Sequence, residues 1–334
     1  MKVTFEVIKL KFTGPLHIGR GWGDLDHSEP ILHSDTLKSA IFSALIQLEP
    51  EWKKRAVEFF SDIKISSCFP YSGNELFLPK LHLKRKFYFE GISEKKHPKI
   101  SKNIEYFSLN IFKRYINSDE ILHIKKGQLS ENYRFVFENE NGCSKRIIAD
   151  QTQQRVHVKY FYESIPFFAN RIFFEKECGL YFLATFKSPE IKKEFLKAVR
   201  YLGDLGIGTD RTVGNGFFEF NENENISTVE FTVDNHDAFA SLGLYLPLKE
   251  EIQRIDFEKS SWGLLQRGGY IAGSEYVKFR HLLKRSIFMF SEGSLFKMSV
   301  PPEGKLADLK PDWNDPDMHE IWRCGKTLFI PVKL

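Results

Sequence analysis

The chain has 334 residues, enough for one large or two ordinary domains, and 42% of them are hydrophobic and 28% charged. This composition argues against a disordered or fibrous chain, and no apolar window approaches the length of about eighteen residues that a membrane-spanning helix needs. The first residues, MKVTFEVIKLKF, alternate like a strand and lack the apolar core of a signal peptide. The cysteines lack metal-ligand spacing, which predicts a cytoplasmic protein without a zinc site; they are Cys68, Cys143, Cys178 and Cys324.

Charge is distributed unevenly along the chain, although the net charge is only +4. Residues 81–160 contain 16 Lys and Arg against 9 Asp and Glu, so this segment carries +7 and the remaining chain −3. A basic segment on a mildly acidic body is typical of a protein that holds a polyphosphate. The same pattern also fits a solvated, lysine-rich loop region.

The first elements follow in the order strand, helix, hairpin. Alternation predicts a strand over residues 3–12, which Gly14-Pro15 ends. A helix is predicted from an N-cap at Ser34, with Asp35 in its first turn, to Leu48. Residues 63–69 and 75–81 flank the turn signal Tyr71-Ser72-Gly73-Asn74 and predict a β-hairpin.

The elements after the hairpin complete a recognisable order. Residues 83–160 show weak periodicity and are predicted to be a basic insertion. A strand over 179–186 precedes a helix with Ser188 as cap, Pro189 in its first position and Gly203 at its end. Residues 217–220 form a further strand. This order predicts a βαββαβ ferredoxin-like domain over residues 1–221, the topology of RNA-recognition-motif domains.

A polar break at residues 221–225 is the expected domain boundary. Residues 228–334 contain apolar strand signals but poorer helices, which favours a second, degenerate ferredoxin-like domain. Its strands are expected at 229–233, 242–246, 286–290 and 327–332. The predicted fold class is therefore α+β, with tandem ferredoxin-like (RRM-like) domains and a basic insertion in the first.

Residues 203–220, GDLGIGTDRTVGNGFFEF, place five glycines within fourteen positions. Neither the Walker spacing nor GxGxxG is present, and the stretch leads from a helix into a strand, which excludes the usual nucleotide-binding loops. Glycines let main-chain N–H groups approach a phosphate or ribose, and Arg211 can fork onto a phosphate. A turn with positive φ angles is the structural alternative, which explains one or two of the glycines.

A second glycine-rich stretch, PLHIGRGWG over residues 15–23, follows the first strand. In a ferredoxin-like domain, the loop after the first strand and the loop before the last strand lie at the same end of the sheet. We therefore expect the two glycine-rich stretches to converge.

Four stretches together resemble the RAMP proteins of CRISPR systems, and within them the family of the fourth subunit of the Csm-type, type III-A interference complex. They are LHIGRGWGDLDHSEPILHSDTLKSAI, DQTQQRVHVKYFYESIPFFANRIFFEKECGLYFLATF, LGDLGIGTDRTVGNGFFEF and GKTLFIPV. The resemblance spans nearly the whole chain in the same motif order. It implies a non-catalytic subunit, without cofactor or metal, that holds the 5′ handle of the guide crRNA. It also implies contacts with the large polymerase/cyclase-like subunit and the backbone RAMP subunits.

The resemblance implies a set of RNA-binding residues that lie in these stretches. They are His17, Ile18, Gly19, Ser34, Lys38, Arg155, Lys159, Gly206, Gly208, Arg211, Gly214 and Gly216. One departure concerns charge: relatives often have a basic residue between the last two loop glycines, where this chain has Asn215. Arg211 or the basic insertion is expected to supply the missing charge.

Aromatic residues lie among the lysines and arginines of the insertion, a combination suited to phosphate neutralisation and base stacking. The alternative is that these aromatics form the core of the insertion. They are Phe87, Tyr88, Phe89, Tyr106, Phe107 and Tyr115.

Two other functions compete with RNA binding by a scaffold subunit. His17 or His157 could act as general acid or base in a metal-independent endoribonuclease that processes CRISPR repeat RNA. His27 and His33 are further candidates for this role, and Asp24, Asp26 and Asp35 are candidates for RNA cleavage; turn and helix-capping roles explain the aspartates better. The 32 phenylalanines would also suit a subunit that binds only proteins.

Overall fold

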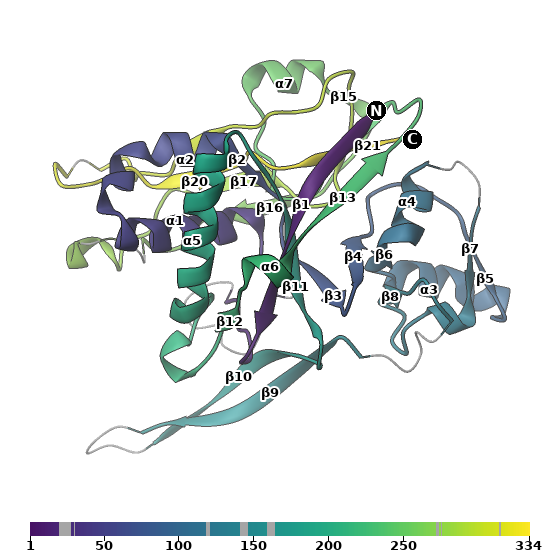
Figure 1. The fold of residues 1–334 in the computed structure, drawn as a ribbon, viewed down its shortest axis with the longest axis horizontal. Helices are drawn as coiled ribbons and strands as arrows, with labels where there is room; N and C mark the ends of the chain where they lie inside the picture. The colour runs from purple at the N-terminus through teal and green to yellow at the C-terminus, as the bar shows by residue number, and fades with distance from the viewer. Residues whose placement is uncertain are drawn as a thin grey trace.

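The fold is built on β1 (Lys2–Phe12), which lies inside the largest sheet (Figure 1). β1 pairs antiparallel with β11 (Cys178–Phe186) on one side and with β12 (Phe218–Glu219) and β13 (Ile226–Thr232) on the other. Consecutive side chains of a strand point to opposite faces, so Val7 and Ile8 enter different hydrophobic clusters and both faces are covered. The computed structural model describes residues 1–19, 28–29, 31–117, 121–140, 146–158, 164–271, 274, 276–313 and 315–334.

Beyond β11 the sheet continues through the predicted hairpin. Gly73, with φ +58°, makes the turn between its two strands, which confirms the hairpin signal. The further strands of this sheet are β2 (Ile63–Ile65), β3 (Phe69–Ser72), β4 (Glu75–Pro79), β6 (Tyr106–Ser108) and β8 (Phe135–Val136).

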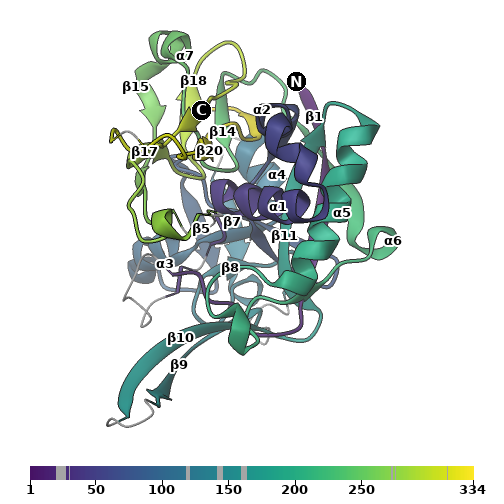
Figure 2. The same cartoon turned by 90° about the vertical axis from the view of Figure 1, so that its left-hand side faces the viewer.

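Two helices cover one face of this sheet, α1 (Ser34–Leu48) and α5 (Pro189–Leu205) (Figure 2). The Ser188 hydroxyl accepts a hydrogen bond from the Ile191 N–H at 3.3 Å, so the predicted cap is confirmed. The predicted end at Gly203 is wrong, because the helix runs on to Leu205 and ends at Gly206, with φ +75°. Between the two helices along the chain lie η1 (Pro50–Arg55) and α2 (Ala56–Asp62).

The basic segment forms a small helical and stranded layer beside β4 and β6 (Figure 1). Its hydrophobic side chains join the cluster that covers one face of the main sheet, so the segment is packed onto the body. Its other elements are β5 (Phe87–Glu90), η2 (Glu94–Lys96), α3 (His97–Asn103), α4 (Leu109–Asn117), β7 (Leu122–Lys125) and η3 (Lys126–Gln128).

A long hairpin of β9 (Ile148–His157) and β10 (Ile165–Phe174) extends away from the body in both views (Figures 1 and 2). Apolar side chains are exposed towards its outer end, among them Val158 and Phe168. The hairpin therefore extends beyond residue 160, the expected end of the insertion, and its returning strand runs to Phe174.

The second half of the chain forms smaller sheets. The expected strands at 286–290 and 327–332 are present as β17 (Ile287–Phe290) and β21 (Phe329–Val332), but residues 242–246 follow a strand that ends at Ser241. One sheet contains β15 (Asp256–Ser261), β18 (Leu295–Lys297), β14 (Ala238–Ser241) and β21 (Phe329–Val332). The remaining elements are α7 (Lys249–Arg254), β16 (Leu264–Arg267), η6 (Val277–Phe279), β17 (Ile287–Phe290), β19 (Leu306–Asp308) and β20 (Trp322–Cys324).

The two halves share a hydrophobic core. The strand expected at 229–233 in the second half is β13, which pairs with β1 after a short helix, α6 (Glu222–Asn225), at the polar break. Val229 and Phe231 pack in the same cluster as Phe5 of β1 and Ile330 of β21. The chain therefore returns to its first sheet before it builds the second half.

Candidate nucleic-acid interface

The two glycine-rich stretches converge, as predicted. The N-terminal loop (residues 13–19) lies beside the glycine loop (residues 206–216): the Gly216 N–H donates to the Pro15 carbonyl at 2.8 Å and the Thr209 N–H donates to the His17 carbonyl at 3.0 Å. On its other side, Leu16 forms a β-bridge with Ile172 of β10, with both N–H···O distances 2.8 Å. Glycine loop, N-terminal loop and hairpin base therefore form one continuous backbone surface.

Protein packing explains most of the glycines in the glycine loop. A Cβ added at Gly208 would overlap the His17 carbonyl oxygen, and one at Gly216 would overlap the Ile207 carbonyl oxygen. Gly214 differs, because its Cβ position has open space although its φ is +92°. Structural reasons therefore account for more than the one or two glycines expected, because close approach of the two loops already requires glycine.

The outer rim of the glycine loop is exposed. Thr209, Arg211, Thr212 and Gly214 face solvent, and residues 211–213 form a single turn of 3-10 helix. Asp210 before this turn has a left-handed backbone, with φ +59°, a conformation that Asp tolerates better than most residues. The rim therefore presents one guanidinium, two hydroxyls and a glycine backbone to a ligand.

Beneath the rim, two polar side chains are buried without full hydrogen bonding. His17 is 1% exposed; its Nδ1 lies 2.6 Å from the Asn170 carbonyl oxygen, and its Nε2 has no hydrogen-bond partner within the described ranges. Asn215 is 0% exposed, and neither its Oδ1 nor its Nδ2 has a hydrogen-bond partner among the described residues. Unsatisfied polar atoms cost free energy when buried, so this place calls for an explanation.

Arg171 of β10 is a candidate that the sequence analysis missed. It is 6% exposed, and its Nε and Nη2 have no hydrogen-bond partner within the described part of the chain. Burial and the neighbouring Arg155 lower the pKa of Arg171, while Asp210 of the glycine loop opposes them. The signal available in the sequence was the arginine that closes IPFFANR, a strand whose base pairs with the N-terminal loop.

The other expected residues of this region divide between the interface and the interior. Arg155 lies half-buried on β9 opposite Phe167. Ile18 is buried and Gly19 half-buried; the Ile18 N–H donates to the Ser28 hydroxyl at 3.0 Å. Lys159 lies outside the described residues, as do Asp24, Asp26 and His27, and nothing is described of the His157 side chain.

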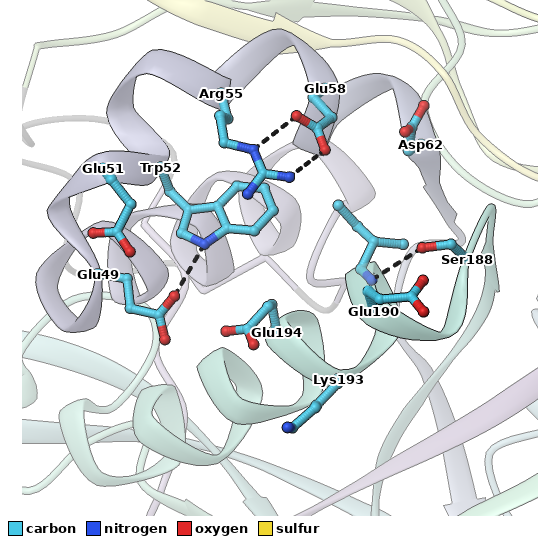
Figure 3. A pocket seen from close by; sticks show the side chains of 11 residues that line it. Glu49, Glu51, Trp52, Arg55, Glu58, Asp62, Ser188, Glu190, Lys193 and Glu194 are labelled. Carbon is cyan, nitrogen blue, oxygen red and sulfur yellow. Dashed lines mark hydrogen bonds and ion pairs between the residues drawn. The ribbon is translucent and has the colours of Figure 1, made fainter.

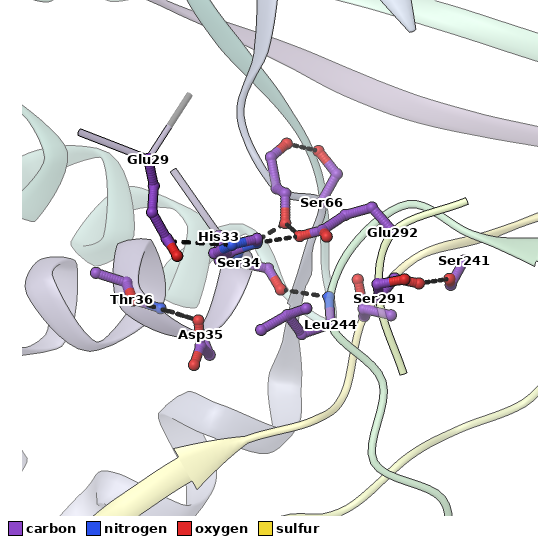
Figure 4. Close-up of polar contacts among 12 residues, drawn as sticks. Glu29, His33, Ser34, Asp35, Thr36, Ser66, Ser241, Leu244, Ser291 and Glu292 are labelled. Atoms are coloured by element: carbon purple, nitrogen blue, oxygen red, sulfur yellow. Dashed lines mark hydrogen bonds and ion pairs between the residues drawn. The ribbon is translucent and has the colours of Figure 1, made fainter. Parts of the chain in front are cut away.

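Ser34 and Lys38 lie in the interior, away from any RNA-accessible surface. The Ser34 hydroxyl accepts from the Leu244 N–H at 2.9 Å, and helix α1 begins at Ser34 itself, so Ser34 is not its N-cap (Figure 4). The Lys38 ammonium donates to the carbonyls of Phe60, at 2.9 Å, and Ile63 and contacts the Cys324 sulfur at 3.5 Å. Burial lowers the pKa of Lys38, and the Cys324 thiol opposes this shift. We therefore remove both residues from the candidate interface.

Asp35 and His33 join the two halves of the chain through buried charges. Asp35 binds Arg323 at 2.6 Å and Arg267 at 3.0 Å; burial opposes its charge, but Arg323 and Arg267 hold the pKa of Asp35 well below its usual range. His33 contacts Glu292 at 2.7 Å and Glu29 at 3.3 Å (Figure 4). Burial opposes protonation of His33 too, but these carboxylates raise its pKa to about 10. The segment ILHSDTL therefore joins the two halves.

The insertion aromatics are mostly core, so the stacking interpretation fails for most of them. Phe89, Tyr106, Phe107 and Tyr115 are buried and Phe87 is half-buried, whereas Tyr88 is exposed. Many basic side chains of the same segment are exposed, among them Lys84, Lys86, Lys95, Lys96, Arg114, Lys125, Lys126 and Arg146. The segment therefore offers charge at its surface and few stacking platforms.

A cavity of about 370 Å³ lies between the N-terminal end of α5 and the segment formed by η1 and α2 (Figure 3). The Arg55 guanidinium stacks 3.9 Å from the Trp52 ring centre and binds Glu58. Carboxylates dominate the lining, namely Glu49, Glu51, Glu58, Asp62, Glu190 and Glu194. Their charge repels phosphate, and the length of α5 places the cavity about 25 Å from the glycine loop, so it is a poor RNA site.

The described residues contain no group of three or more His, Cys, Asp or Glu placed to hold a metal ion. Cys68, Cys178 and Cys324 are buried, and Cys143 lies outside the described residues. Among the helices that the structure describes, none is both long and apolar enough to cross a membrane.

Comparisons with known proteins agree with this architecture. The CRISPR Csm4 C-terminal domain model matches residues 234–332. The chain is 26% identical to a protein of Methanocaldococcus jannaschii named CRISPR system Cms protein Csm4, over 97% of this chain and 96% of that protein. It is 25% identical to a Thermococcus onnurineus protein of the same name, over 91% of this chain and 92% of that one.

Solved structures of the same fold cover the chain almost completely. A chain in the Csm3–Csm4 subcomplex of a type III-A CRISPR-Cas interference complex has a TM-score of 0.65 at 19% identity, with 99% of this chain and 100% of that chain covered. A chain of a Csm1–Csm4 cassette in complex with cA4 has a TM-score of 0.58 at 21% identity, with 99% of each chain covered. Since the model of the RAMP superfamily matches residues 9–219, more than half of the sequence, this chain belongs to the RAMP superfamily.

Proposed function

We propose that this chain is a non-catalytic, cytoplasmic RNA-binding subunit of a type III-A CRISPR effector complex. It holds the 5′ handle of the guide crRNA and contacts the large polymerase/cyclase-like subunit, Csm1, and a backbone RAMP subunit, Csm3. Membership of the RAMP superfamily, the curated relatives named Csm4 and the likeness to chains solved as Csm3–Csm4 and Csm1–Csm4 complexes support this assignment.

The arrangement of strands supports the finer proposal of a ferredoxin-like first domain. The order β12–β1–β11–β3, with helices α1 and α5 on one face, corresponds to the strand order of a βαββαβ domain. The third strand of that domain is β11, whereas the second strand of the predicted hairpin, β4, was expected in this place. We propose residues 1–221 and 228–334 as the two ferredoxin-like units, with the qualification that β13 completes the first sheet.

The exposed rim of the glycine loop is the observation that carries RNA binding. A sugar-phosphate backbone can approach the main chain at Gly214 without meeting a side chain, and Arg211 beside it can neutralise a phosphate. Arg155 on the neighbouring hairpin extends this basic surface. We assign the RNA to this rim, the N-terminal loop and the hairpin base.

The position of His17 argues against the nuclease alternative. A general base must come within hydrogen-bond reach of the 2′-hydroxyl that attacks the phosphodiester. The His17 imidazole is 1% exposed and its Nδ1 is occupied by the Asn170 carbonyl. Its place suits a residue that positions the N-terminal loop better than one that transfers protons to RNA.

Fluorescence anisotropy with a labelled repeat-derived RNA tests the proposal on the full chain. The logarithm of affinity should fall with the logarithm of salt concentration, with a slope of about −0.7 per neutralised phosphate, or about −3.5 for five phosphates. Arg211→Gln should weaken binding and make the slope less steep by about 0.7. A slope near zero for the unchanged protein would favour a subunit that binds only proteins.

A cleavage assay separates the scaffold from the nuclease. The repeat RNA should stay intact after incubation with the protein in the presence of a chelator. Site-specific cutting that disappears in His17→Ala would establish the nuclease instead.

A further inference from the structure

Arg171 is unusual because two nitrogens of its guanidinium, Nε and Nη2, are buried and have neither a hydrogen-bond nor an ion-pair partner among the residues that the structure describes. A buried charge without a counter-charge is strongly unfavourable in a folded protein. Other buried charged groups in the described part of the chain have partners: Asp35 has two arginines, His33 lies between two carboxylates, and the Lys38 ammonium donates to two carbonyls. Arg171 stands apart from this pattern, which points to a partner that the isolated chain does not supply.

The two unpartnered nitrogens have a specific geometry. Nε and Nη2 are the atoms whose N–H bonds point in parallel from one edge of the guanidinium, and this edge binds two oxygens of one phosphate or carboxylate. A single unpaired nitrogen would suit a water molecule or a carbonyl. Two on the same edge suit a bidentate anion.

The surroundings of Arg171 connect this edge to the candidate RNA surface. Its strand neighbour Ile172 is bridged to Leu16, and its other neighbour, Asn170, contacts His17 through its carbonyl. Asp210 of the glycine loop and Arg155 of β9 are both close enough to act on the Arg171 charge. Buried, unpartnered atoms of His17 and Asn215 lie in the adjacent loops.

We propose that Arg171 is a bidentate phosphate-binding residue beneath the glycine loop, where it supplies the positive charge that Asn215 does not. The phosphate belongs to the RNA backbone, so this assignment rests on the proposed function. Both nitrogens are shielded from water, and a phosphate reaches them only after a local rearrangement of the surrounding chain. Relief of the buried, unpaired charge favours that rearrangement.

Three variants of the full chain test the assignment with the labelled repeat-derived RNA. Arg171→Met should weaken binding roughly 10- to 100-fold, the loss expected for a charge-assisted hydrogen-bonded pair, and reduce the salt slope by about 0.7. Arg171→Lys should keep the slope but bind more weakly than the native protein, because an ammonium cannot form the fork. Lys126→Met, an exposed charge on the insertion, is the matched control and should change affinity less than Arg171→Met.

Thermal stability distinguishes phosphate binding from a structural role. Without RNA, Arg171→Met should melt no lower than the native protein, since it removes an unpaired buried charge. A lower melting temperature together with weaker binding would mean that Arg171 supports the fold, and unchanged affinity in Arg171→Met would also overturn the assignment.

Inorganic tripolyphosphate separates this inference from the proposed function. The native protein should be stabilised by tripolyphosphate and Arg171→Met should not. If the native protein binds no RNA but shows this Arg171-dependent stabilisation, the anion site stands and the RNA assignment fails. If RNA binds without any dependence on Arg171, the proposed function stands and the site fails.

Discussion

The Asp35 carboxylate and the Arg323 guanidinium lie 288 positions apart in the sequence and meet at 2.6 Å in the interior. Arg267 binds the same carboxylate through its Nε at 3.0 Å. Asp35 belongs to the first turn of α1, whereas both arginines belong to strands of the second half. One buried carboxylate therefore fixes the second half against the helix that covers the first sheet.

Asp35→Asn should destabilise the protein strongly. It leaves two arginines without their counter-charge in the interior, and breaking a buried pair in this way costs about 3–5 kcal/mol. The free energy of unfolding from urea titration measures the loss. Glu58→Gln, which breaks the exposed pair with Arg55, is the control and should cost less than about 1 kcal/mol. Equal, small losses in both variants would show that Asp35 does not hold the halves together.

His33 should make stability depend on pH in the alkaline range. The pKa of His33 is raised from 6.5 to about 10 in the folded protein, so its contribution is complete below pH 6.5 and is lost as pH rises through about 10. Over this window the folded state holds one proton more than the unfolded state, so the free energy of unfolding falls by about 1.4 kcal/mol for each unit by which the pH rises. The pKa of Glu292 is lowered, so its contribution is lost as pH falls below its usual 4.5.

Comparison with His33→Gln isolates this effect from the titration of lysines and tyrosines. Urea titrations at several pH values above 6.5 should show a shallower decline for the variant than for the native protein. Parallel curves for the two proteins would contradict the proposed protonation of His33 in the folded state.

Local patterns predicted the elements of the first half well, because the alternation and capping signals there match the burial and hydrogen bonding of the folded protein. The alternation of residues 3–12 became β1, and Ser188 caps α5 through its own hydroxyl. The strand expected at 229–233 is present as β13, but its pairing with β1 did not follow from the sequence, because alternation reveals that a strand exists and says nothing of its neighbour. Gly203 was read as a helix end, although Phe218 packs so closely against it that no side chain fits.

The candidate interface was predicted only in part, because local sequence patterns do not reveal which residues become neighbours in the fold. Convergence of the two loops followed from topology, since the ends of neighbouring strands meet. The family resemblance implies RNA binding by Ser34 and Lys38, yet their partners are Leu244, Phe60 and Ile63, which are remote in sequence. Arg171 escaped notice because a lone arginine in a strand carries no signal until its lack of a partner is visible.

Gly208 and Gly214 should respond differently to the same substitution. Both have φ near +90°, so alanine introduces backbone strain of about 1–2 kcal/mol at either position. Only at Gly208 does the new Cβ also overlap the His17 carbonyl, which would separate the two loops. Gly208→Ala should therefore lower the melting temperature and the RNA affinity more than Gly214→Ala. If Gly214→Ala abolishes RNA binding while the protein remains folded, the expected order of the two losses is wrong. The RNA then lies too close to the backbone at Gly214 to leave room for a Cβ.

Lys38 and Arg211 should show opposite patterns of loss. Lys38→Met keeps the apolar stem but deprives the buried carbonyls of Phe60 and Ile63 of their donor, which should cost at least about 2 kcal/mol of stability. The RNA affinity of the folded variant should stay unchanged, because the ammonium never faces the ligand. Arg211→Gln should reduce affinity with little change in melting temperature, since Arg211 is exposed on the rim. Melting curves and fluorescence anisotropy of the two variants test these expectations. A loss of RNA affinity in Lys38→Met, measured below its melting temperature, would show that Lys38 contributes to RNA binding and would refute its purely structural role.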